Sequence, residues 1–236
     1  MNLGIIPARG GSKRIPRKNI KSFAGRPMIA WSIVAAIESG CFDRLIVSTD
    51  DEEIAEISQR WGAEVPFFRP TELADDYATT ADVVRHAINW SAQEDRIPER
   101  VCCIYATAPF VRSNDVTLGL HMLETRQADF AFSATSYAFP VQRAITVTPE
   151  GRVNMLMPQY LNSRSQDLEE VYHDAGQFYW GRSEAWVLGK ALFSSSATAV
   201  ILPRYRVQDI DTPDDWLRAE LMFKALHDLD AALSKA

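Results

Sequence analysis

Six cationic side chains and two adjacent glycines lie between residues 9 and 21, a stretch without acidic residues that we call the basic loop. Gly10 and Gly11 let a backbone turn sharply and bring N–H groups close to an anion. Ser12 adds a hydroxyl donor, and the cations supply positive charge. The spacing matches neither G-x-x-x-x-G-K-[ST] nor G-x-G-x-x-G, so the loop is not a Walker loop or a dinucleotide fingerprint. These residues alone predict an anion-binding loop, with a solvated surface loop as the alternative.

Two carboxylates near the C-terminus, Asp209 and Asp211, form a second candidate group. On an extended strand, side chains two residues apart point to the same face, so both could share a Mg²⁺ ion held mainly through water and substrate phosphates. The alternative is a helix cap, because Thr212 is a good N-cap residue and Asp215 completes a pair that resembles a capping box. The spacing alone leaves both interpretations open.

The elements that must position these residues alternate between strand and helix patterns. Strands are expected over residues 3–6, 44–50, 64–68, 101–106 and 129–136, and helices over 27–40, 51–62, 80–93, 114–125 and 213–233. This alternation predicts an α/β fold with a mainly parallel sheet. Ligands bind such sheets beyond the carboxyl ends of the strands. The basic loop directly follows the first strand, so it lies where a ligand site is expected.

Residues 137–180 interrupt this alternation. Two runs with strand composition flank Pro149-Glu150-Gly151, which predicts a hairpin. A polar segment over residues 162–181 follows. We expect an insertion that packs against a partner or closes a site, with a plain edge hairpin as the alternative.

Composition narrows the class of protein. The chain has 236 residues, of which 47% are apolar and 24% charged, as is typical of a folded globular protein with one large domain. Its net charge is −6, and six of its 25 cations lie in the basic loop, which leaves 19 against 31 acidic residues. A nucleic-acid-binding protein presents a broad basic surface, so this distribution argues against one. It favours recognition of one small, highly charged anion.

Hydropathy and cysteine usage predict a cytoplasmic protein. We expect no transmembrane helix, because no stretch approaches 18 apolar residues, and no signal peptide. Cys102 and Cys103 are adjacent and would point to opposite faces of a strand, so we expect small buried thiols and no disulfide, with Cys41 as the third cysteine.

Three longer motifs resemble one known family. The stretch "IIPARGGSKRIPRKNI" (5–20) resembles the signature of the CMP-sialic acid synthetase family, the cytidylyltransferases that activate nonulosonic acids. The blocks at residues 48–76 and "DIDTPDDW" (209–216) resemble two further family motifs. Within the family, "YATAPF" (105–110) and residues 162–181 are most similar to the pseudaminic acid cytidylyltransferase branch. Sialic acid enzymes usually show "QPTSP" where this chain has Tyr105, a departure that argues against ordinary sialic acid as substrate.

The resemblance implies a fold, a reaction and an assembly. The fold would be a Rossmann-like, three-layer nucleotidyltransferase domain over residues 1–136 and 181–236, with a homodimerisation insertion over 137–180 that closes the sugar site. The reaction would be an Mg²⁺-dependent transfer of CMP from CTP to a nonulosonic acid, with pseudaminic acid favoured, releasing pyrophosphate. The alternatives are a CMP-sialic or CMP-legionaminic acid synthetase and, in another class, a non-catalytic CTP-binding module.

The same resemblance assigns residues on the nucleotide side. Arg9, Lys18 and Asp211 would be catalytic, and Asp209 and Asp211 would hold the metal. Arg9, Ser12 and Lys18 would bind the triphosphate, and Arg69, Ala78 and Thr80 the base and ribose. The full set expected to bind the nucleotide is Pro7, Ala8, Arg9, Gly10, Gly11, Ser12, Lys18, Asn19, Arg69, Ala78 and Thr80.

On the sugar side, the resemblance points mainly to the polar segment. A sugar carboxylate calls for a cation or a set of donors, for which Arg164 and Gln166 are candidates. The full set expected to bind the sugar is Tyr105, Thr107, Arg164, Gln166, Tyr172, His173, Asp174, Gln177 and Tyr179. Residues of the insertion would act in cis or in trans. No general base is evident, since His86 is expected to be structural, and contact of a metal ion with the anomeric hydroxyl could replace one.

Overall fold

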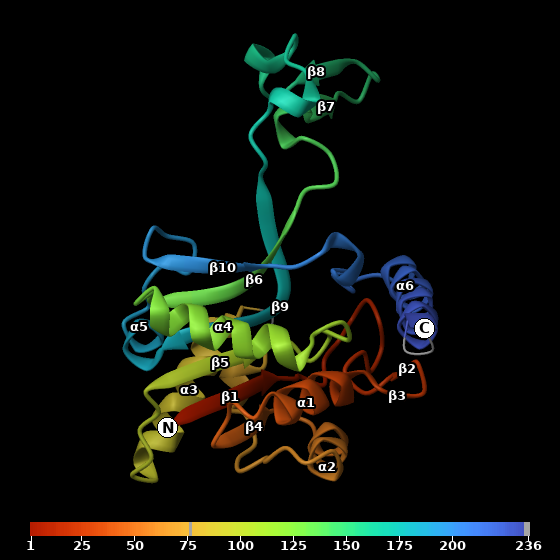
Figure 1. Cartoon of the computed structure of the whole chain (residues 1–236). Helices are drawn as coiled ribbons and strands as arrows, with labels where there is room; N and C mark the ends of the chain where they lie inside the picture. Colours follow the sequence, from red (N-terminus) through yellow and green to blue (C-terminus); the bar gives the residue numbers. More distant parts are fainter. Residues whose placement is uncertain (76, 234–236) are drawn as a thin grey trace.

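The computed structural model describes residues 1–75 and 77–233, and its centre is a six-stranded sheet between two layers of helices (Figure 1). The strand order is β10-β6-β9-β5-β1-β4, and β9 alone runs antiparallel to its neighbours. The strands are β1 (Asn2–Pro7), β4 (Arg44–Ser48), β5 (Arg100–Ile104), β6 (Phe130–Ser136), β9 (Tyr172–Arg182) and β10 (Ala197–Ile201). The helices are α1 (Met28–Ser39), α2 (Glu52–Arg60), α3 (Thr80–Gln93), α4 (Ser113–Thr125), α5 (Ser183–Val187) and α6 (Pro213–Leu233). This arrangement confirms the predicted three-layer α/β fold with a mainly parallel sheet.

One face of the sheet packs against α1, α2 and α4. Ile6, Cys102 and Trp180 from three strands are fully buried in one cluster, together with Ile33 of α1 and Val116 of α4. Burying each large apolar side chain stabilises the fold by roughly 1.5–3 kcal/mol. This cluster therefore fixes the helices that follow β1 and β5.

The opposite face packs against α3 and α5. Ile5, Cys103 and Tyr179 belong to this second cluster, with Val84 of α3 and Trp186 of α5. Neighbouring strand residues thus enter opposite clusters, as the pleat requires. Cys102 and Cys103 are both buried and unpaired, as the sequence predicted.

Helix α6 packs against a small hairpin made of β2 (Ser22–Phe23) and β3 (Arg26–Pro27). The Phe23 ring meets Trp216 and Phe223 edge-on, at centroid distances of 5.5 and 5.3 Å. Lys21 lies over Trp216, 4.3 Å from the ring centroid. This aromatic cluster brings residues 209–211, which precede α6, next to the basic loop.

Most predicted elements are confirmed, and the differences lie in short or non-local strands. The helices expected over 80–93 and 213–233 have these bounds in the structure. Residues 64–68 form only isolated bridges, at Glu64 and Phe68. Helix α5 and strand β10 were not predicted, because both are only five residues long and lack a clear period.

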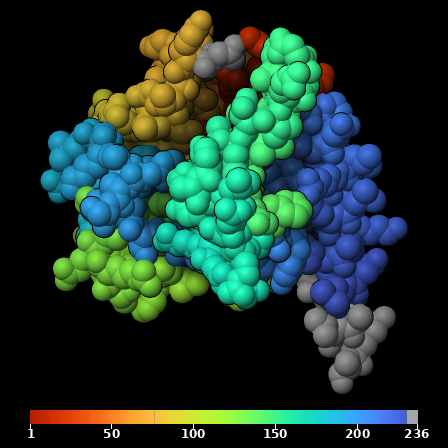
Figure 2. Space-filling model, turned by 90° about the horizontal axis from the view of Figure 1, so that it is seen from above, coloured from red at the N-terminus to blue at the C-terminus, as the bar shows by residue number. Residues whose placement is uncertain are grey.

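A projecting segment over residues 137–171 rises from the sheet on two extended chains (Figure 1). It carries the predicted hairpin, β7 (Ile145–Val147) and β8 (Val153–Met155), around Gly151. Figure 2 looks down on this segment, which stands over the body between the N-terminal half and α6. The segment ends earlier than the expected boundary at residue 180, because residues 172–182 pair with β5 and β6 as strand β9.

No described helix is long and apolar enough to span a membrane.

Candidate active site

A pocket of about 530 Å³, which we call the loop pocket, opens at the carboxyl ends of β1, β4 and β5. It brings together residues that are far apart in the sequence, from the basic loop to the start of α6. The predicted site residues that line it are Pro7, Arg9, Ser12, Lys18, Asn19, Arg69, Ala78, Thr80, Tyr105, Thr107 and Asp211.

The six cations of the basic loop divide into two groups. Arg9, Lys13, Arg14 and Lys18 line the loop pocket. Arg17 has a positive φ of 56° and forms a bidentate pair with Asp51, the N-cap of α2, and also pairs with Glu53. Lys21 lies on Trp216, as described above. Two of the cations therefore anchor the loop to α2 and α6, and four face the pocket.

Two residues predicted to contact the nucleotide, Ala8 and Gly10, already donate their backbone N–H groups to acceptors within the protein. The Ala8 N–H donates to the Ser48 carbonyl at 2.9 Å, and the Gly10 N–H donates to Asp50 Oδ1 at 2.9 Å. A Cβ at Gly10 would lie 2.7 Å from Asp51 Oδ2, so glycine permits close approach to α2. Ala8, Gly10 and Gly11 do not line the loop pocket, and their contact with a nucleotide stays a prediction.

Lys18 and Asp211 connect the basic loop to the segment before α6. Lys18 Nζ donates to the Ile210 carbonyl at 2.7 Å and lies 3.3 Å from Asp211 Oδ1. Arg14 pairs with the other Asp211 oxygen at 2.8 Å. The Asn19 amide donates to the Arg9 carbonyl at 2.9 Å. Residues 192 positions apart therefore form one polar group at the pocket wall.

The opposite wall contains a buried arginine. Arg69 is 7% exposed; its Nε donates to Ser48 Oγ at 3.1 Å, and its guanidinium also donates to the Ser48 carbonyl. Burial lowers the pKa of Arg69. Thr80, the first residue of α3, has its hydroxyl 3.4 Å from the Tyr105 hydroxyl. This wall therefore offers polar groups held in place by hydrogen bonds within the protein.

A second pocket of about 420 Å³, which we call the strand pocket, lies beside the first along the same edge of the sheet. Tyr105 lines both pockets. The other predicted residues of the strand pocket are His173, Asp174, Tyr179 and Asp209. His173 Nδ1 lies 2.8 Å from the Asp174 carbonyl oxygen, and its ring meets Tyr137 edge-on.

Asp209 and Asp211 line different pockets, Asp209 the strand pocket and Asp211 the loop pocket. The segment between them is irregular rather than a strand. Burial, and next the Asp211 carboxylate, raise the pKa of Asp209. Thr212 and Asp215 form the expected reciprocal cap, because the Asp215 N–H donates to Thr212 Oγ1 at 3.2 Å and the Thr212 N–H to Asp215 Oδ2 at 2.8 Å. Capping is therefore performed by this neighbouring pair and leaves both aspartates at the pockets.

Four predicted sugar-site residues do not line either pocket. Gln177 is 3% exposed, and its amide donates to the Arg206 carbonyl at 2.6 Å. Arg164 and Gln166 lie in the projecting segment, where Arg164 pairs with Asp167 at 2.7 Å. Tyr172, at the start of β9, donates to Glu170 at 2.7 Å. Their role as sugar ligands stays a prediction, which for Arg164 and Gln166 requires a neighbouring chain or a movement of the segment.

Several lining residues are not among the individually predicted site residues, although Arg14 belongs to the basic loop. Arg14 and Asp75 line the loop pocket, and Arg204 and Arg218 line the strand pocket. Asp75 accepts from Arg9 through its carbonyl oxygen at 2.9 Å. The cations at 204 and 218 stand outside the motifs, so only the fold reveals them. Residue 76, the last of the second motif, lies outside the described residues.

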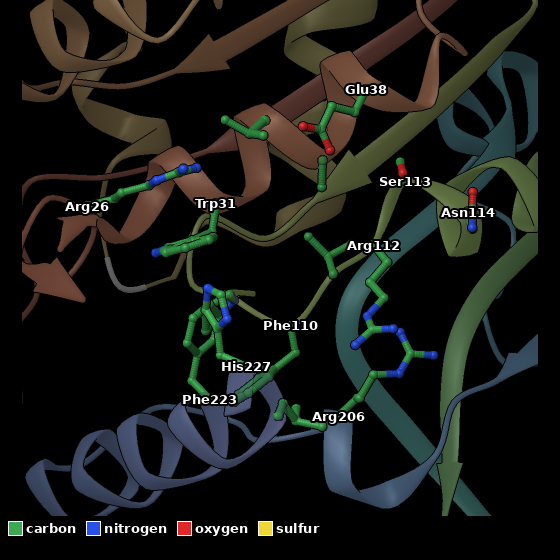
Figure 3. A pocket seen from close by; sticks show the side chains of 15 residues that line it. Arg26, Trp31, Glu38, Phe110, Arg112, Ser113, Asn114, Arg206, Phe223 and His227 are labelled. Carbon is green, nitrogen blue, oxygen red and sulfur yellow. The ribbon is translucent and has the colours of Figure 1, made fainter. Parts of the chain in front are cut away.

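A third cavity, of about 410 Å³, lies between α1, the loop after β5 and α6 (Figure 3). Trp31, Phe110 and Phe223 form its aromatic wall, with Arg206 at one side. Arg206 donates two hydrogen bonds to the Asp115 carboxylate, with N–O distances of 2.6 and 3.3 Å. None of the predicted site residues lines this cavity, so the candidate site is the pair of pockets at the strand ends.

Known proteins resemble this chain along nearly its whole length. A profile described as "Cytidylyltransferase" matches residues 3–196. The chain belongs to the cytidylyltransferase family. This cytidylyltransferase is 44% identical to the pseudaminic acid cytidylyltransferase of Campylobacter jejuni over 227 residues, which cover 96% of this chain and 98% of that protein. It is therefore an enzyme of the nucleotidyltransferase class.

More distant relatives share the length and the fold. The CMP-N,N'-diacetyllegionaminic acid synthase of Legionella pneumophila is 30% identical over 232 residues, covering 94% of this cytidylyltransferase and 96% of the relative. A CMP:2-keto-3-deoxy-manno-octonic acid synthetase solved with CTP superposes with a TM-score of 0.68 at 17% identity, covering 95% of this chain and 98% of that one. The 4-diphosphocytidyl-2C-methyl-D-erythritol synthase of Anaerococcus prevotii gives 0.63 at 13% identity, with coverages of 94% and 98%. These structures confirm the Rossmann-like nucleotidyltransferase fold.

Proposed function

We propose that this cytidylyltransferase transfers CMP from CTP to pseudaminic acid, giving CMP-pseudaminic acid and pyrophosphate. The observation that carries the proposal is the near full-length identity of 44% to a protein named for that activity. The adjoining loop and strand pockets, which share Tyr105, support it because a two-substrate transfer needs two neighbouring sites.

The loop pocket suits CTP. Arg9, Lys13, Arg14 and Lys18 would hold the triphosphate, and the wall with Arg69, Ala78 and Thr80 would receive the base and ribose. Phosphoryl transfer requires positioning and charge neutralisation more than covalent help from the protein, and four cations on one wall supply both.

In the reaction, the anomeric hydroxyl oxygen of the sugar would bond to the α-phosphorus of CTP. The bond between that phosphorus and the oxygen bridging to the β-phosphate would break in line, and pyrophosphate would leave. The hydroxyl proton would pass to a base that we do not assign. Lys18, held at the Ile210 carbonyl, would stabilise the departing charge.

The residues present fit a magnesium ion. Asp209 and Asp211 offer hard carboxylate oxygens, and they lie close enough for Asp211 to raise the pKa of Asp209, a repulsion that a cation would relieve. Bound Mg²⁺ would supply charge neutralisation on the phosphates. We include Mg²⁺ and a cytoplasmic location in the proposal.

The projecting segment suits a homodimer. It exposes apolar side chains, among them Phe139 at 83% and Leu161 at 67%, and an exposed apolar surface of this kind is typical of an interface. A second copy would also place Arg164 near the neighbouring sugar site. Light scattering should therefore give twice the chain mass for the wild type, and Leu161→Asp should shift it toward one chain mass. A monomeric wild type would refute the homodimer.

A pyrophosphate-release assay with CTP tests the function. Pseudaminic, legionaminic and N-acetylneuraminic acids are compared at equal concentrations with Mg²⁺. Pyrophosphate should appear with pseudaminic acid at a kcat/KM about 100-fold above the others, since a site that hydrogen-bonds its substrate discriminates strongly. Equal rates with N-acetylneuraminic acid would contradict the sugar assignment. Calorimetric CTP binding with no turnover for any of the three acids would instead support a binding module.

A further inference from the structure

Strand β9 contains a bulge where it passes the carboxyl edge of the sheet. Tyr179 pairs with Phe132 of β6, whereas Asp174 pairs with Ala134, so β9 has extra residues between these two pairs. Gly176 within the bulge has a φ of +62°, in the left-handed region that glycine adopts readily. Bulges at the rims of sheets commonly redirect a side chain. Asp174, at the end of this bulge, lines the strand pocket.

The bulge is held by hydrogen bonds. The Gly176 N–H donates to Asp174 Oδ1 at 2.8 Å. The N–H groups of Gln177 and Phe178 both donate to Ser133 Oγ at 3.2 Å. These three hydrogen bonds hold the backbone next to Asp174 before any ligand binds.

A buried tyrosine fixes the second oxygen of the same carboxylate. The Tyr179 hydroxyl donates to Asp174 Oδ2 at 2.6 Å, and Tyr179 is only 3% exposed. Burial, followed by the neighbours Tyr105 and Asp174, holds the pKa of Tyr179 far above its ordinary value, so it remains a donor. Each carboxylate oxygen can accept about two hydrogen bonds, so Asp174 keeps acceptor capacity toward the pocket.

We infer that Asp174 is a preorganised acceptor for one acylamino N–H of the sugar acid, and that Tyr179 is its positioning residue. This inference rests on the proposed function and names the group through which the sugar is selected. A carboxylate repels the sugar's own carboxylate, so Asp174 does not bind that group. An acylamino N–H, of the kind named for the Legionella relative's product, is the donor that best matches an acceptor.

Tyr179→Phe tests the positioning role. It keeps the ring in its cluster and removes the hydrogen bond, which should raise KM for pseudaminic acid about tenfold, since the bond involves a charged acceptor. The KM for CTP should change less than about twofold, because Tyr179 does not itself line the loop pocket and the substitution keeps the ring that packs against Tyr105. Tyr205→Phe is the matched control, since Tyr205 is 60% exposed and lines neither pocket. An unchanged sugar KM in Tyr179→Phe would overturn the positioning role.

A double-mutant cycle, in which a change in the enzyme is combined with a change in the sugar, tests Asp174 itself. Wild type and Asp174→Ala are assayed with pseudaminic acid and with analogues in which each acylamino group is replaced by an ester in turn. One replacement should cost the wild type about tenfold or more in kcat/KM and cost Asp174→Ala little, because the missing donor and the missing acceptor belong to one bond. Additive losses for every analogue would overturn the inference.

Failure of the proposed function and failure of this inference would give different results. If the wild type releases no pyrophosphate with pseudaminic acid, the proposed function fails. If it does so and both the Tyr179→Phe and Asp174→Ala tests give the contradicting result, only the inference fails. Thermal unfolding and CTP binding by calorimetry verify that each variant is folded.

Discussion

The loop pocket and the strand pocket are built in different ways. The loop pocket takes four cations from one continuous segment, residues 9–18, and adds single residues from the next strand ends. The strand pocket takes its polar groups from β6, β9, the segment after β10 and α6. The expected sugar-carboxylate ligand, Arg164, lies away from it in the projecting segment. The contrast indicates that most of the proposed nucleotide side comes from one continuous segment, whereas the proposed sugar side depends on long-range pairing and, in the proposed homodimer, would also use a neighbouring chain.

The largest effect should come from breaking the loop pocket at Lys18. Lys18→Ala should lower kcat/KM for CTP about 100- to 1,000-fold, because a positioned cation aimed at developing charge is worth several kcal/mol. Lys21→Ala is the matched control from the same loop, since Lys21 lies on Trp216 outside the pocket, and it should change kcat/KM less than about threefold. Pyrophosphate release at saturating sugar measures both. Equal losses in the two variants would mean that the loop acts only through its total charge.

Asp211→Ala should be nearly as damaging, for another reason. It removes the carboxylate that Arg14 and Lys18 contact, and with it one of the two oxygen donors proposed for Mg²⁺. We expect a loss of about 100-fold in kcat and a weaker response to Mg²⁺. Titration of the rate with Mg²⁺ measures this. Full activity with an unchanged titration would remove Asp211 from the metal site.

An intermediate effect is expected on the sugar side at Arg164. Its pair with Asp167 is exposed and contributes little to stability, so Arg164→Ala should remain folded. It should raise KM for the sugar about tenfold through loss of a charge-assisted contact. Mixing it with Lys18→Ala distinguishes cis from trans action. If Arg164 acts in trans, mixed dimers contain one site with intact Lys18 and an intact Arg164 from the partner, and activity returns.

The same contrast explains what could be predicted from the sequence. The loop pocket follows from a contiguous motif after a strand, and helices such as α3 and α6 follow from apolar periodicity and capping. The strand pocket does not, because β9 is antiparallel and pairs with residues 36 or more positions earlier, which local patterns cannot reveal. The charge of the basic loop also did not reveal that its cations have different roles, because Arg17 is bound to Asp51 and does not face the pocket. Only the fold places an acidic cap beside that arginine.

A modest effect on stability should separate Arg17 from the cations that face the pocket. Arg17→Ala should lower the free energy of unfolding at pH 7 by about 1 kcal/mol, the scale of a partly exposed bidentate pair. The hydrogen bond from Arg17 lowers the pKa of Asp51, so this contribution is present above the carboxyl's unfolded pKa and disappears as the pH falls through its folded value. Urea unfolding measured at pH 7 and at successively lower pH should therefore show a difference from the wild type that is largest at pH 7 and shrinks as Asp51 becomes protonated. A difference that persists in acid would point to lost packing.

The smallest effect is expected on stability at Asp209, where the substitution should stabilise the protein instead of destabilising it. Burial and the Asp211 carboxylate raise the pKa of Asp209, so the folded protein loses stability as the pH rises through the titration of this group. Asp209→Asn mimics the neutral form and should raise the melting temperature by about 1–3 °C at pH 7 without metal, while activity falls. Added Mg²⁺ should raise the melting temperature of the wild type and change that of the variant less, because ligand binding stabilises only a competent site. A variant that melts lower than the wild type without metal would show that the two carboxylates do not repel each other, and the case for a shared cation would weaken with it.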